Sequence, residues 1–309
     1  MLEIFLKTLP FFALIGVGYG AGRTQFFTEE ATSYLTKFVF YFALSAMLFR
    51  FAANLSIGEI FDPRVAAGYL WGTAFVYGVA MAVAFLRGTD TPTAAIEAQC
   101  AAIGNTGFLG VPMLALLMGQ AAVAPIILVL SIDLIVFSSL LVILVVGARQ
   151  GAMNLSIIRT VAVGLAKNPM IVAIALGLGV AASGLTVPAP VNDFLTILGN
   201  AATPGALFAI GASLATKSAE RVQIAAWLSF CKLVLHPALV FVGLYVLFPA
   251  DPFKASVVVS AAALPVAGNV FILAQHYKIA PHRVSASILI STAVSILTVS
   301  LVIAWVTGS

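Results

Sequence analysis

The chain has 309 residues, of which 62% are hydrophobic and 8% are charged. Soluble domains carry about 25% charged residues. This composition therefore excludes a soluble domain and indicates an integral membrane protein. The formal net charge of +4 comes from short connections without a block of like charge, which gives no indication of a nucleic-acid partner.

Apolar stretches of about 20 residues, the length that crosses a bilayer as a helix, recur along the chain. Connections that carry charges, proline or glycine separate them. The pattern predicts ten membrane-spanning helices, at residues 2–22, 31–53, 65–86, 94–118, 122–148, 168–185, 191–215, 222–248, 254–277 and 284–307. The first stretch has no early basic cluster and no small-residue cleavage site, so we expect it to be retained.

Basic residues are distributed unequally between the two sets of connections. Nine lie on the side reached after odd-numbered helices and four on the other side. Cytoplasmic connections are rich in Lys and Arg, so we expect the nine-residue side to be cytoplasmic and both termini to lie outside. The only long connection runs mid-chain from Arg149 to Lys167. Lys37 and Arg50 lie near helix ends, where we expect them to snorkel.

The two halves of the chain resemble each other. A shift of 159 residues pairs Pro10 with Pro169, Gly18 with Gly177, Gly20 with Gly179 and Leu48-Phe49 with Leu207-Phe208. The pattern predicts two repeats, residues 1–150 and 151–309. Five crossings is an odd number, so the second repeat would be inverted in the membrane. We interpret the glycines of this series, with Gly16, as positions of close helix packing.

Two of the predicted helices contain helix-breaking residues near their middle. The runs are Gly104-Asn105-Thr106-Gly107-Phe108-Leu109-Gly110-Val111-Pro112 in residues 94–118 and Ala263-Leu264-Pro265-Val266-Ala267-Gly268-Asn269 in residues 254–277. Backbone that leaves the helix in hydrocarbon costs several kcal/mol per unpaired group. A matched pair of breaks therefore indicates a transporter binding site. The alternative is that glycine and proline only kink these helices for packing.

The breaks predict a site for an anion. Where a helix restarts, its first N–H groups are unpaired and equivalent to roughly half a positive charge. Two such starts that face one point bind an anion without a basic side chain. Asn105, Thr106 and Asn269 would add hydrogen bonds, and Gly107 and Gly268 belong to the same restarts.

Three ionisable residues are candidates for ion coupling. Asp133 is a carboxylate deep in an apolar run, where a charge costs at least about 2.5–3.5 kcal/mol. It suits a proton carrier, and the alternative is a fixed hydrogen bond between helices. Lys232 could neutralise Asp133 or attract an anion, and it could equally snorkel or form a structural ion pair. His236, one turn further and next to Pro237, could also simply pack.

No enzyme chemistry is recognisable in the sequence. Metal-binding, phosphate-binding and prenyl-transferase motifs are missing, and Ser213 with His236 is the only nucleophile–base pair that could be proposed. Cys100 and Cys231 both lie in apolar segments, which argues against a disulfide framework. We therefore expect neither an enzyme nor a metal or other cofactor.

Several motifs together resemble the auxin efflux carrier family. They are Asn105-Thr106 with Gly110-Val111-Pro112, Ala263-Leu264-Pro265, Ala274-Gln275-His276-Tyr277, and Lys232-Leu233 with Pro237. The family includes the plant PIN-FORMED auxin transporters and bacterial proteins described as malonate and malate permeases. The chain resembles the bacterial branch, because its central connection is short and it departs from the plant pattern at Gly104, Val266 and Asn269.

The resemblance implies an all-α membrane fold of ten helices in two inverted five-helix repeats, related to bile-acid symporters and sodium/proton antiporters. Helices 1, 2, 6 and 7 would form a scaffold, and helices 3–5 and 8–10 an elevator-like transport domain. Helices 4 and 9 would cross at Gly104, Asn105 and Pro265, and Ser131 with Asp133 would line the site. It also implies a multi-pass protein of the bacterial cytoplasmic membrane, with periplasmic termini, that forms a homodimer through the scaffold in the lipid.

The sequence thus predicts a secondary transporter that exports a small organic anion, such as a carboxylate, by alternating access. The direction rests on the resemblance alone. One alternative is a sodium-coupled symporter of the bile-acid type, with oxygens of Asn105 and Asn269 as sodium ligands. The other alternative is a passive anion channel, whose flux would not saturate.

Overall fold

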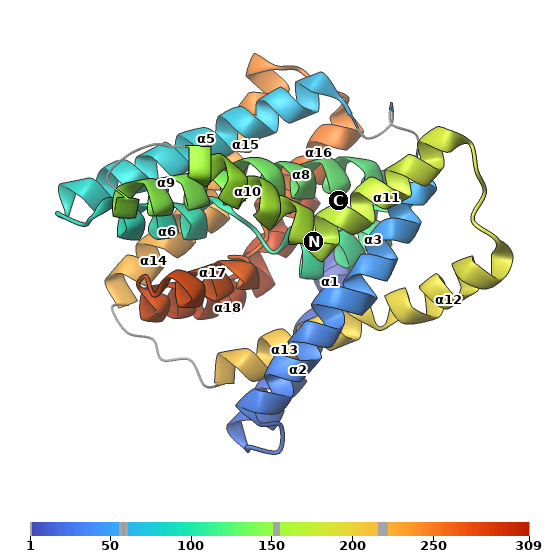
Figure 1. Ribbon diagram of the computed structural model, residues 1–309, viewed down its shortest axis with the longest axis horizontal. Helices are drawn as coiled ribbons and strands as arrows, with labels where there is room; N and C mark the ends of the chain where they lie inside the picture. Colours follow the sequence, from blue (N-terminus) through green and yellow to red (C-terminus); the bar gives the residue numbers. More distant parts are fainter. Residues whose placement is uncertain (1, 56–57, 59–60, 151–154, 216–221, 309) are drawn as a thin grey trace.

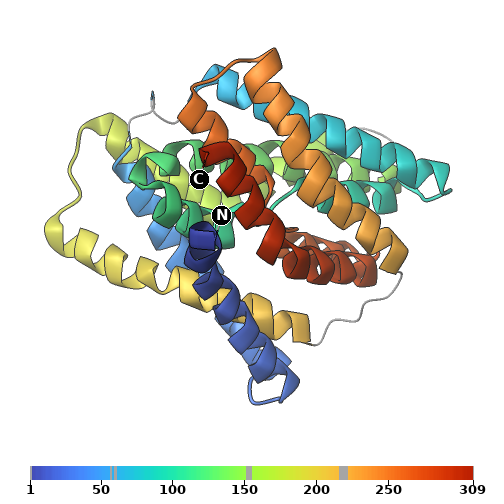
Figure 2. The ribbon, with the colours of Figure 1, turned by 180° about the vertical axis from the view of Figure 1, so that it is seen from behind.

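The computed structural model describes residues 2–55, 58, 61–150, 155–215 and 222–308 (Figures 1 and 2). Within these ranges all regular structure is helical, and one isolated backbone bridge is the nearest approach to a strand. The predicted all-α fold class is therefore confirmed at this level.

The helices follow one another along the chain with short connections. They are α1 (Leu2–Arg23), α2 (Glu29–Phe38), α3 (Leu44–Ala53), α5 (Pro63–Leu86), α6 (Thr91–Ala102), α7 (Val111–Met118), α8 (Val123–Ile132), α9 (Ser138–Gln150), α10 (Leu155–Lys167), α11 (Pro169–Ser183), α12 (Ala189–Asn200), α13 (Ala202–Ala215), α14 (Val222–Phe230), α15 (His236–Val242), α16 (Pro252–Ala262), α17 (Gly268–Tyr277) and α18 (Pro281–Thr307).

Wider, π-helical turns interrupt or extend several of these helices. They are Val39–Ala43, Thr106–Gly110, Asp133–Phe137, Cys231–Leu235 and Gly243–Leu247. Because the first joins α2 to α3 and the third joins α8 to α9, each of these pairs forms one continuous helical rod. Such turns are rare and are often found at functional sites.

In the part of the chain that the structure describes, seven helical rods are long and apolar enough to cross a membrane. They are Leu2–Arg23, Glu29–Ala53, Pro63–Leu86, Gln120–Arg149, Ala189–Ala215, Val222–Leu247 and Pro281–Thr307. Each coincides with one predicted span. An eighth candidate is the pair α10 and α11, bent by 68°, and the two remaining predicted spans are the interrupted ones.

The mid-chain connection differs from the expectation of a loop. Residues 151–154 lie outside the described ranges, but α9 runs to Gln150 and α10 occupies Leu155–Lys167. The α10 helix ends there because Pro169 disfavours helical backbone at Asn168. The Asn168 side chain then accepts hydrogen bonds from the N–H groups of Met170 and Ile171 and starts α11 in a new direction.

Contacts divide the helices into two groups. The first contains α1, α2, α3, α11, α12 and α13, and the second contains α5, α6, α8, α9 and α14–α18. In Figure 2, α1 and α13 lie on one side of the molecule, with the α5, α14, α16 and α18 helices on the other. The most extensive contacts join α1 to α13 and α3 to α11.

Glycines make these two contacts possible. Gly18 faces the backbone of Phe208, and a Cβ at Gly177 would lie 2.6 Å from the carbonyl oxygen of Phe49. The packing prediction is confirmed for these two positions. It is wrong for Gly16, Gly20 and Gly179, where no heavy atom lies within 4 Å of an added Cβ, because these residues face away from the neighbouring helix.

Candidate functional site

The two predicted breaks are present, and they lie against each other. Helix α6 stops at Ala102, and α16 stops at Ala262. Between the helices, the Asn105 N–H donates to the Pro265 carbonyl at 2.8 Å, and the Ala267 N–H donates to the Ile103 carbonyl at 3.1 Å. These bonds form an antiparallel bridge between Gly104 and Val266, so part of the interrupted backbone of each segment is satisfied by the other.

Beyond the bridge, both helices restart with uncapped N-termini. In the turn Thr106–Gly110, which leads into α7, and in helix α17, no N-cap side chain accepts a hydrogen bond from the first N–H groups. The Thr106 N–H itself donates to the Gly104 carbonyl at 2.8 Å, so the donors left at this restart are those that follow Thr106. By contrast, Thr28, Asp62, Asp90, Asn168 and Asp251 cap helices elsewhere in the chain. The two restarts therefore present free N–H donors and positive dipole ends beside the bridge.

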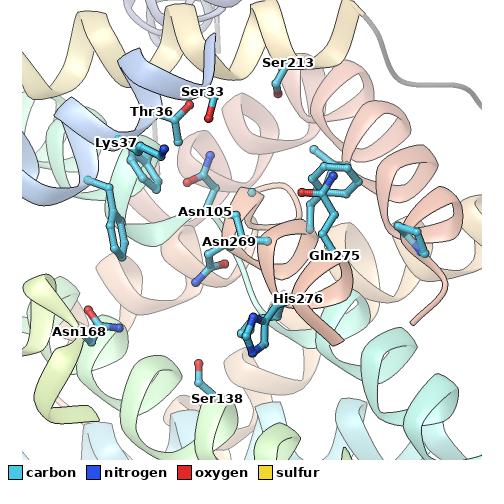
Figure 3. A pocket seen from close by; sticks show the side chains of 18 of the residues that line it. Ser33, Thr36, Lys37, Asn105, Ser138, Asn168, Ser213, Asn269, Gln275 and His276 are labelled. Carbon is cyan, nitrogen blue, oxygen red and sulfur yellow. The ribbon is translucent and has the colours of Figure 1, made fainter. Parts of the chain in front are cut away.

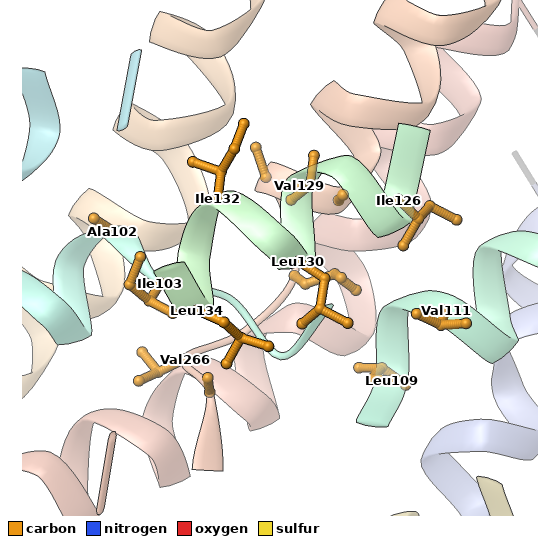
Figure 4. Packing of buried hydrophobic residues seen from close by; sticks show 14 of the residues in the cluster. Ala102, Ile103, Leu109, Val111, Ile126, Val129, Leu130, Ile132, Leu134 and Val266 are labelled. Atoms are coloured by element: carbon orange, nitrogen blue, oxygen red, sulfur yellow. The ribbon is translucent and has the colours of Figure 1, made fainter. Parts of the chain in front are cut away.

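An apolar wall supports the bridge from one side. Figure 4 shows Ile103 and Val266 beside Leu134 of the turn Asp133–Phe137, with Leu130 of α8 nearby. The Val266 N–H, which would otherwise be unpaired there, donates to Ser291 Oγ of α18 at 3.1 Å. The bridge is thus packed and hydrogen-bonded on this side.

A cavity of about 1500 Å³ lies at the bridge and extends between the two helix groups. Asn105, Gly268 and Asn269 line it at the bridge (Figure 3). Its opposite walls include Ser33, Thr36 and Lys37 of α2 together with residues of α10 and α13. The lining reaches the start of α2, the α10–α11 joint and the α17–α18 turn, so the cavity opens at that end of the molecule.

The lining carries an excess of positive charge. Three lysines, Lys37, Lys167 and Lys278, contribute to it, whereas the only carboxylate among the described lining residues is Glu29. Together with the two helix N-termini, these side chains make the cavity suited to an anion.

The predicted binding residues near the bridge fall into two sets. Asn105, Gly268 and Asn269 line the cavity, and the Asn269 Oδ1 atom is buried without a hydrogen-bond partner in the described structure. Thr106 and Gly107 lie just outside the lining. Thr106 is 1% exposed with its Oγ1 unpaired, and Gly107 packs close to Met170 of α11.

The backbone of Gly104 and Pro265 forms the bridge itself. The Pro265 carbonyl accepts the Asn105 N–H, and Gly104 pairs with Val266. A Cβ at Gly104 would lie 3.1 Å from Lys232 Nζ. These two residues therefore shape the site without lining the cavity.

The predicted coupling residues lie behind the bridge in buried polar contacts. Asp133 is 2% exposed and accepts a hydrogen bond from the Tyr69 hydroxyl at 2.7 Å, while its Oδ2 has no partner in the described structure. Ser131, two residues earlier, is half-buried and also lies outside the lining. The structure therefore does not bring Ser131 or Asp133 into the cavity with the two asparagines.

Lys232 and His236 are fully buried and contact each other, with Lys232 Nζ 3.0 Å from His236 Nδ1. Lys232 also donates to the Ala262 carbonyl at the end of α16, and His236 Nε2 lies 3.0 Å from Thr73 Oγ1. Within the described residues no ion pair joins Lys232 to Asp133. The ammonium instead sits at the negative end of a half-helix, where a cation is favoured.

Sequence reasoning missed Lys37 as a cavity residue and treated it as a snorkelling side chain. The α2 helix carries Ser33, Thr36 and Lys37 at spacings of three and four residues, which places them on one face. A polar face on a membrane-spanning helix is a signal for a water-filled or protein-lined surface. That spacing could have identified the wall.

The all-helical architecture, the spanning helices and the polar cavity at two interrupted helices define a multi-pass membrane transport protein. A family model described as "Membrane transport protein" matches residues 3–303, and the chain belongs to this family, the auxin efflux carrier family.

Relatives with curated names are similar over almost their whole length. A protein of Rhizobium meliloti (strain 1021) named "Putative malonate transporter" is 30% identical over 97% of this chain and 95% of its own length. The "Uncharacterized transporter YfdV" of Escherichia coli (strain K12) is 28% identical over 94% of each chain. The family and these relatives are transporters, not enzymes.

Proposed function

We propose that this membrane transporter moves a small organic anion by alternating access as a secondary active carrier. The observation that carries the proposal is the cavity, which is lined by three lysines and one carboxylate and ends at two uncapped helix N-termini. Such an arrangement binds a carboxylate through backbone N–H groups and amide side chains.

The proposed mechanism includes a fold of ten crossings in two inverted repeats. In this proposal the seven spanning rods, the bent pair α10–α11 and the two interrupted pairs, α6 with α7 and α16 with α17, account for one crossing each. The repeat is supported by two equivalent contacts, since Gly18 with Phe208 and Gly177 with Phe49 are related by the same shift of 159 residues. Helices α6 and α16 also correspond, because each begins with an aspartate cap and ends at the bridge.

In this proposal the first helix group is the scaffold and the second is the transport domain. The cavity lies between them, as an elevator-type carrier requires. One buried hydrogen bond between the groups joins Thr8 Oγ1 of α1 to Ser300 Oγ of α18 at 2.9 Å. A contact of this kind can break and reform as the transport domain moves.

The charge distribution supports an orientation with both termini in the periplasm of a bacterial cytoplasmic membrane. The cavity lining reaches Lys167, Lys278 and the start of α2, which belong to the positively charged side. The described conformation would then face inward and load substrate from the cytoplasm. We propose export as the direction on the resemblance to the family alone.

Transport in proteoliposomes tests the function. Malonate is the first compound to try, because one relative carries its name. We expect saturable uptake of labelled malonate that is accelerated by unlabelled malonate on the opposite side, because a carrier exchanges substrate across one moving site. Flux that rises linearly with concentration, without such acceleration, would identify a channel instead.

The same vesicles distinguish the coupling ions. Replacing sodium by choline should leave transport unchanged if the carrier does not use sodium, and abolished transport would instead support the sodium symporter. An imposed proton gradient should accelerate transport if protons are coupled. Failure of malonate and other small mono- and dicarboxylates to move at all would refute the anion carrier.

A further inference from the structure

The break after α16 leaves one backbone carbonyl without its usual donor. In an uninterrupted helix the Ala262 carbonyl would accept the N–H of Val266, four residues further on. Here the Val266 N–H donates to Ser291 Oγ at 3.1 Å instead. The Ala262 carbonyl accepts a hydrogen bond from the Lys232 ammonium. The end of α16 thus takes a charged donor from another helical segment in place of its own backbone.

The position of the Lys232 ammonium is one that attracts a cation. Ala262 is the last residue of α16, and the last carbonyls of a helix carry the negative end of its dipole. Gly104 of the bridge is also close, because a Cβ added there would lie 3.1 Å from Lys232 Nζ and 3.4 Å from the Ala261 carbonyl oxygen. The ammonium therefore lies where the end of α16 meets the bridge.

Neutral groups bind this ammonium directly. Lys232 is 0% exposed, and its Nζ lies 3.0 Å from His236 Nδ1. An ammonium can only donate, so Nδ1 accepts, and a neutral imidazole then carries its proton on Nε2, which lies 3.0 Å from Thr73 Oγ1. Among the described residues no carboxylate lies within 4.0 Å of Lys232 Nζ. The ammonium is therefore held by neutral oxygen and nitrogen acceptors, in the manner of a bound ion.

The Asp133 carboxylate belongs to the same buried cluster without touching Lys232. It accepts the Tyr69 hydroxyl at 2.7 Å, and the Tyr69 ring lies 5.8 Å from the His236 ring between centroids. Tyr69 and Thr73 are one turn apart on α5, so both side chains lie on one face of that helix. Asp133 is close enough to interact electrostatically with Lys232, so it offsets a charge that would be costly alone.

We infer that Lys232 is a tethered cation: its ammonium fills a site for a small monovalent cation at the end of α16, so the protein needs no free sodium ion there. The inference goes beyond the proposed function, because it concerns how the interrupted backbone is stabilised and not which anion moves. A cation attached to the chain cannot be released on either side of the membrane. The site would be open to a free cation only if the side chain were removed.

Chemical rescue of Lys232→Ala tests this inference in the purified full-length protein, without any carboxylate present. The substitution deletes a propylammonium group, so n-propylammonium is the matching probe, and 1-propanol has the same shape without the charge. Lys232→Ala should melt about 3 °C or more below the wild type, because the Ala262 carbonyl and His236 lose their donor. n-Propylammonium should raise that melting temperature progressively with its concentration by binding the folded state, and 1-propanol should not.

Two further variants serve as controls. Lys254 lies near the start of α16, where its side chain is 31% exposed and pairs with Asp62. Lys254→Ala leaves no enclosed site, so n-propylammonium should not stabilise it. Lys232→Met keeps the length of the side chain without its charge. It should melt below the wild type and should not respond to n-propylammonium, because the methionine still occupies the space.

Other results would overturn the inference. Equal rescue of Lys232→Ala by both probes, or wild-type stability in Lys232→Met, would mean that Lys232 only fills space. Absence of any response to n-propylammonium would mean that no cation site exists. A wild-type melting temperature that rises saturably with sodium chloride but not with choline chloride would reveal a free sodium site, and this measurement requires no variant to fold. Because none of these measurements uses a carboxylate, their failure leaves the proposed anion transport standing.

Discussion

At Asn269, a negative charge would have opposite effects on helix stability and on the binding of an anion. It is the second residue of α17, in an N-terminal turn without a side-chain cap, and its Oδ1 is buried with no hydrogen-bond partner among the described residues. A negative charge at that position favours the helix, because it lies at the positive end of the dipole, by about 0.3–1 kcal/mol. The same charge repels an anionic ligand.

We therefore predict that Asn269→Asp, which is nearly isosteric, lowers malonate affinity about tenfold or more without lowering the melting temperature. Isothermal titration and thermal unfolding of the purified protein measure the two effects. Gln275→Glu, six residues further along the same cavity-lining helix, adds an identical charge and should have a smaller effect. Unchanged malonate binding in Asn269→Asp would remove the half-helix from the binding site.

Some glycines of the helices contact a neighbouring helix and others on the same helices do not. Gly16 and Gly18 lie on the same helix, but only Gly18 meets the Phe208 backbone. We predict that Gly18→Ala and Gly177→Ala each destabilise the protein by about 1–3 kcal/mol, because an added Cβ overlaps main-chain atoms that cannot rotate away. Gly16→Ala and Gly179→Ala should be neutral or stabilising.

Melting temperatures in detergent check this prediction within one set of four alanine variants. The equivalent response of Gly18 and Gly177 would reflect the two matched contacts, α1 with α13 and α11 with α3. A loss of stability in all four variants would mean that glycine is needed for reasons other than close approach.

The buried carboxylate of Glu97 in α6 forms ion pairs with arginines at the end of α5 and in α18. It is 1% exposed and pairs with Arg87 after α5 and with Arg283 of α18, the latter at 2.6 Å. Removing one partner of a buried pair leaves uncompensated charge, so Glu97→Gln should destabilise the protein by about 2–3 kcal/mol.

The control for Glu97→Gln is Glu3→Gln, which breaks the exposed Glu3–Lys7 pair of α1. Solvent screens that pair, so its loss should leave the melting temperature unchanged. If the two variants melted at the same temperature, the Glu97 ion pairs would contribute no more to stability than the exposed Glu3–Lys7 pair.

For the whole molecule, the orientation and the open side of the cavity can be tested together. Cys100 and Cys231 are buried, so a membrane-impermeant maleimide should react mainly with an introduced thiol. Ser33→Cys places one in the cavity wall, and Ser183→Cys places one at the exposed end of α11.

We predict that Ser33→Cys is labelled from the cytoplasmic side and protected by malonate, and that Ser183→Cys is labelled from the periplasmic side without protection. Right-side-out and inside-out vesicles provide the comparison. Labelling of Ser33→Cys from the periplasmic side and of Ser183→Cys from the cytoplasmic side would contradict the orientation derived from the basic residues.

Much of the architecture could be predicted because hydrophobic length and helix-breaking residues are local signals. The spans and the two breaks around Asn105 and Pro265 follow from such signals, and the structure contains both breaks. Asp133 and Lys232 were harder to place, since depth in the membrane does not tell which face of a helix is turned to the cavity. The π-helical turns at Asp133–Phe137 and Cys231–Leu235 further change which side of the helix these residues occupy. No pattern of residues in the sequence predicts these turns.

The bridge between Gly104 and Val266 is built from main-chain atoms, so substitutions of nearby side chains could change the substrate selectivity of this carrier without breaking the bridge. Its geometry makes few demands on the identity of neighbouring side chains, apart from the small residue beside Lys232. Positions 37, 105 and 269 can therefore vary while the frame between them persists. A library randomised at these three positions is where new selectivities should arise at the least expense to folding.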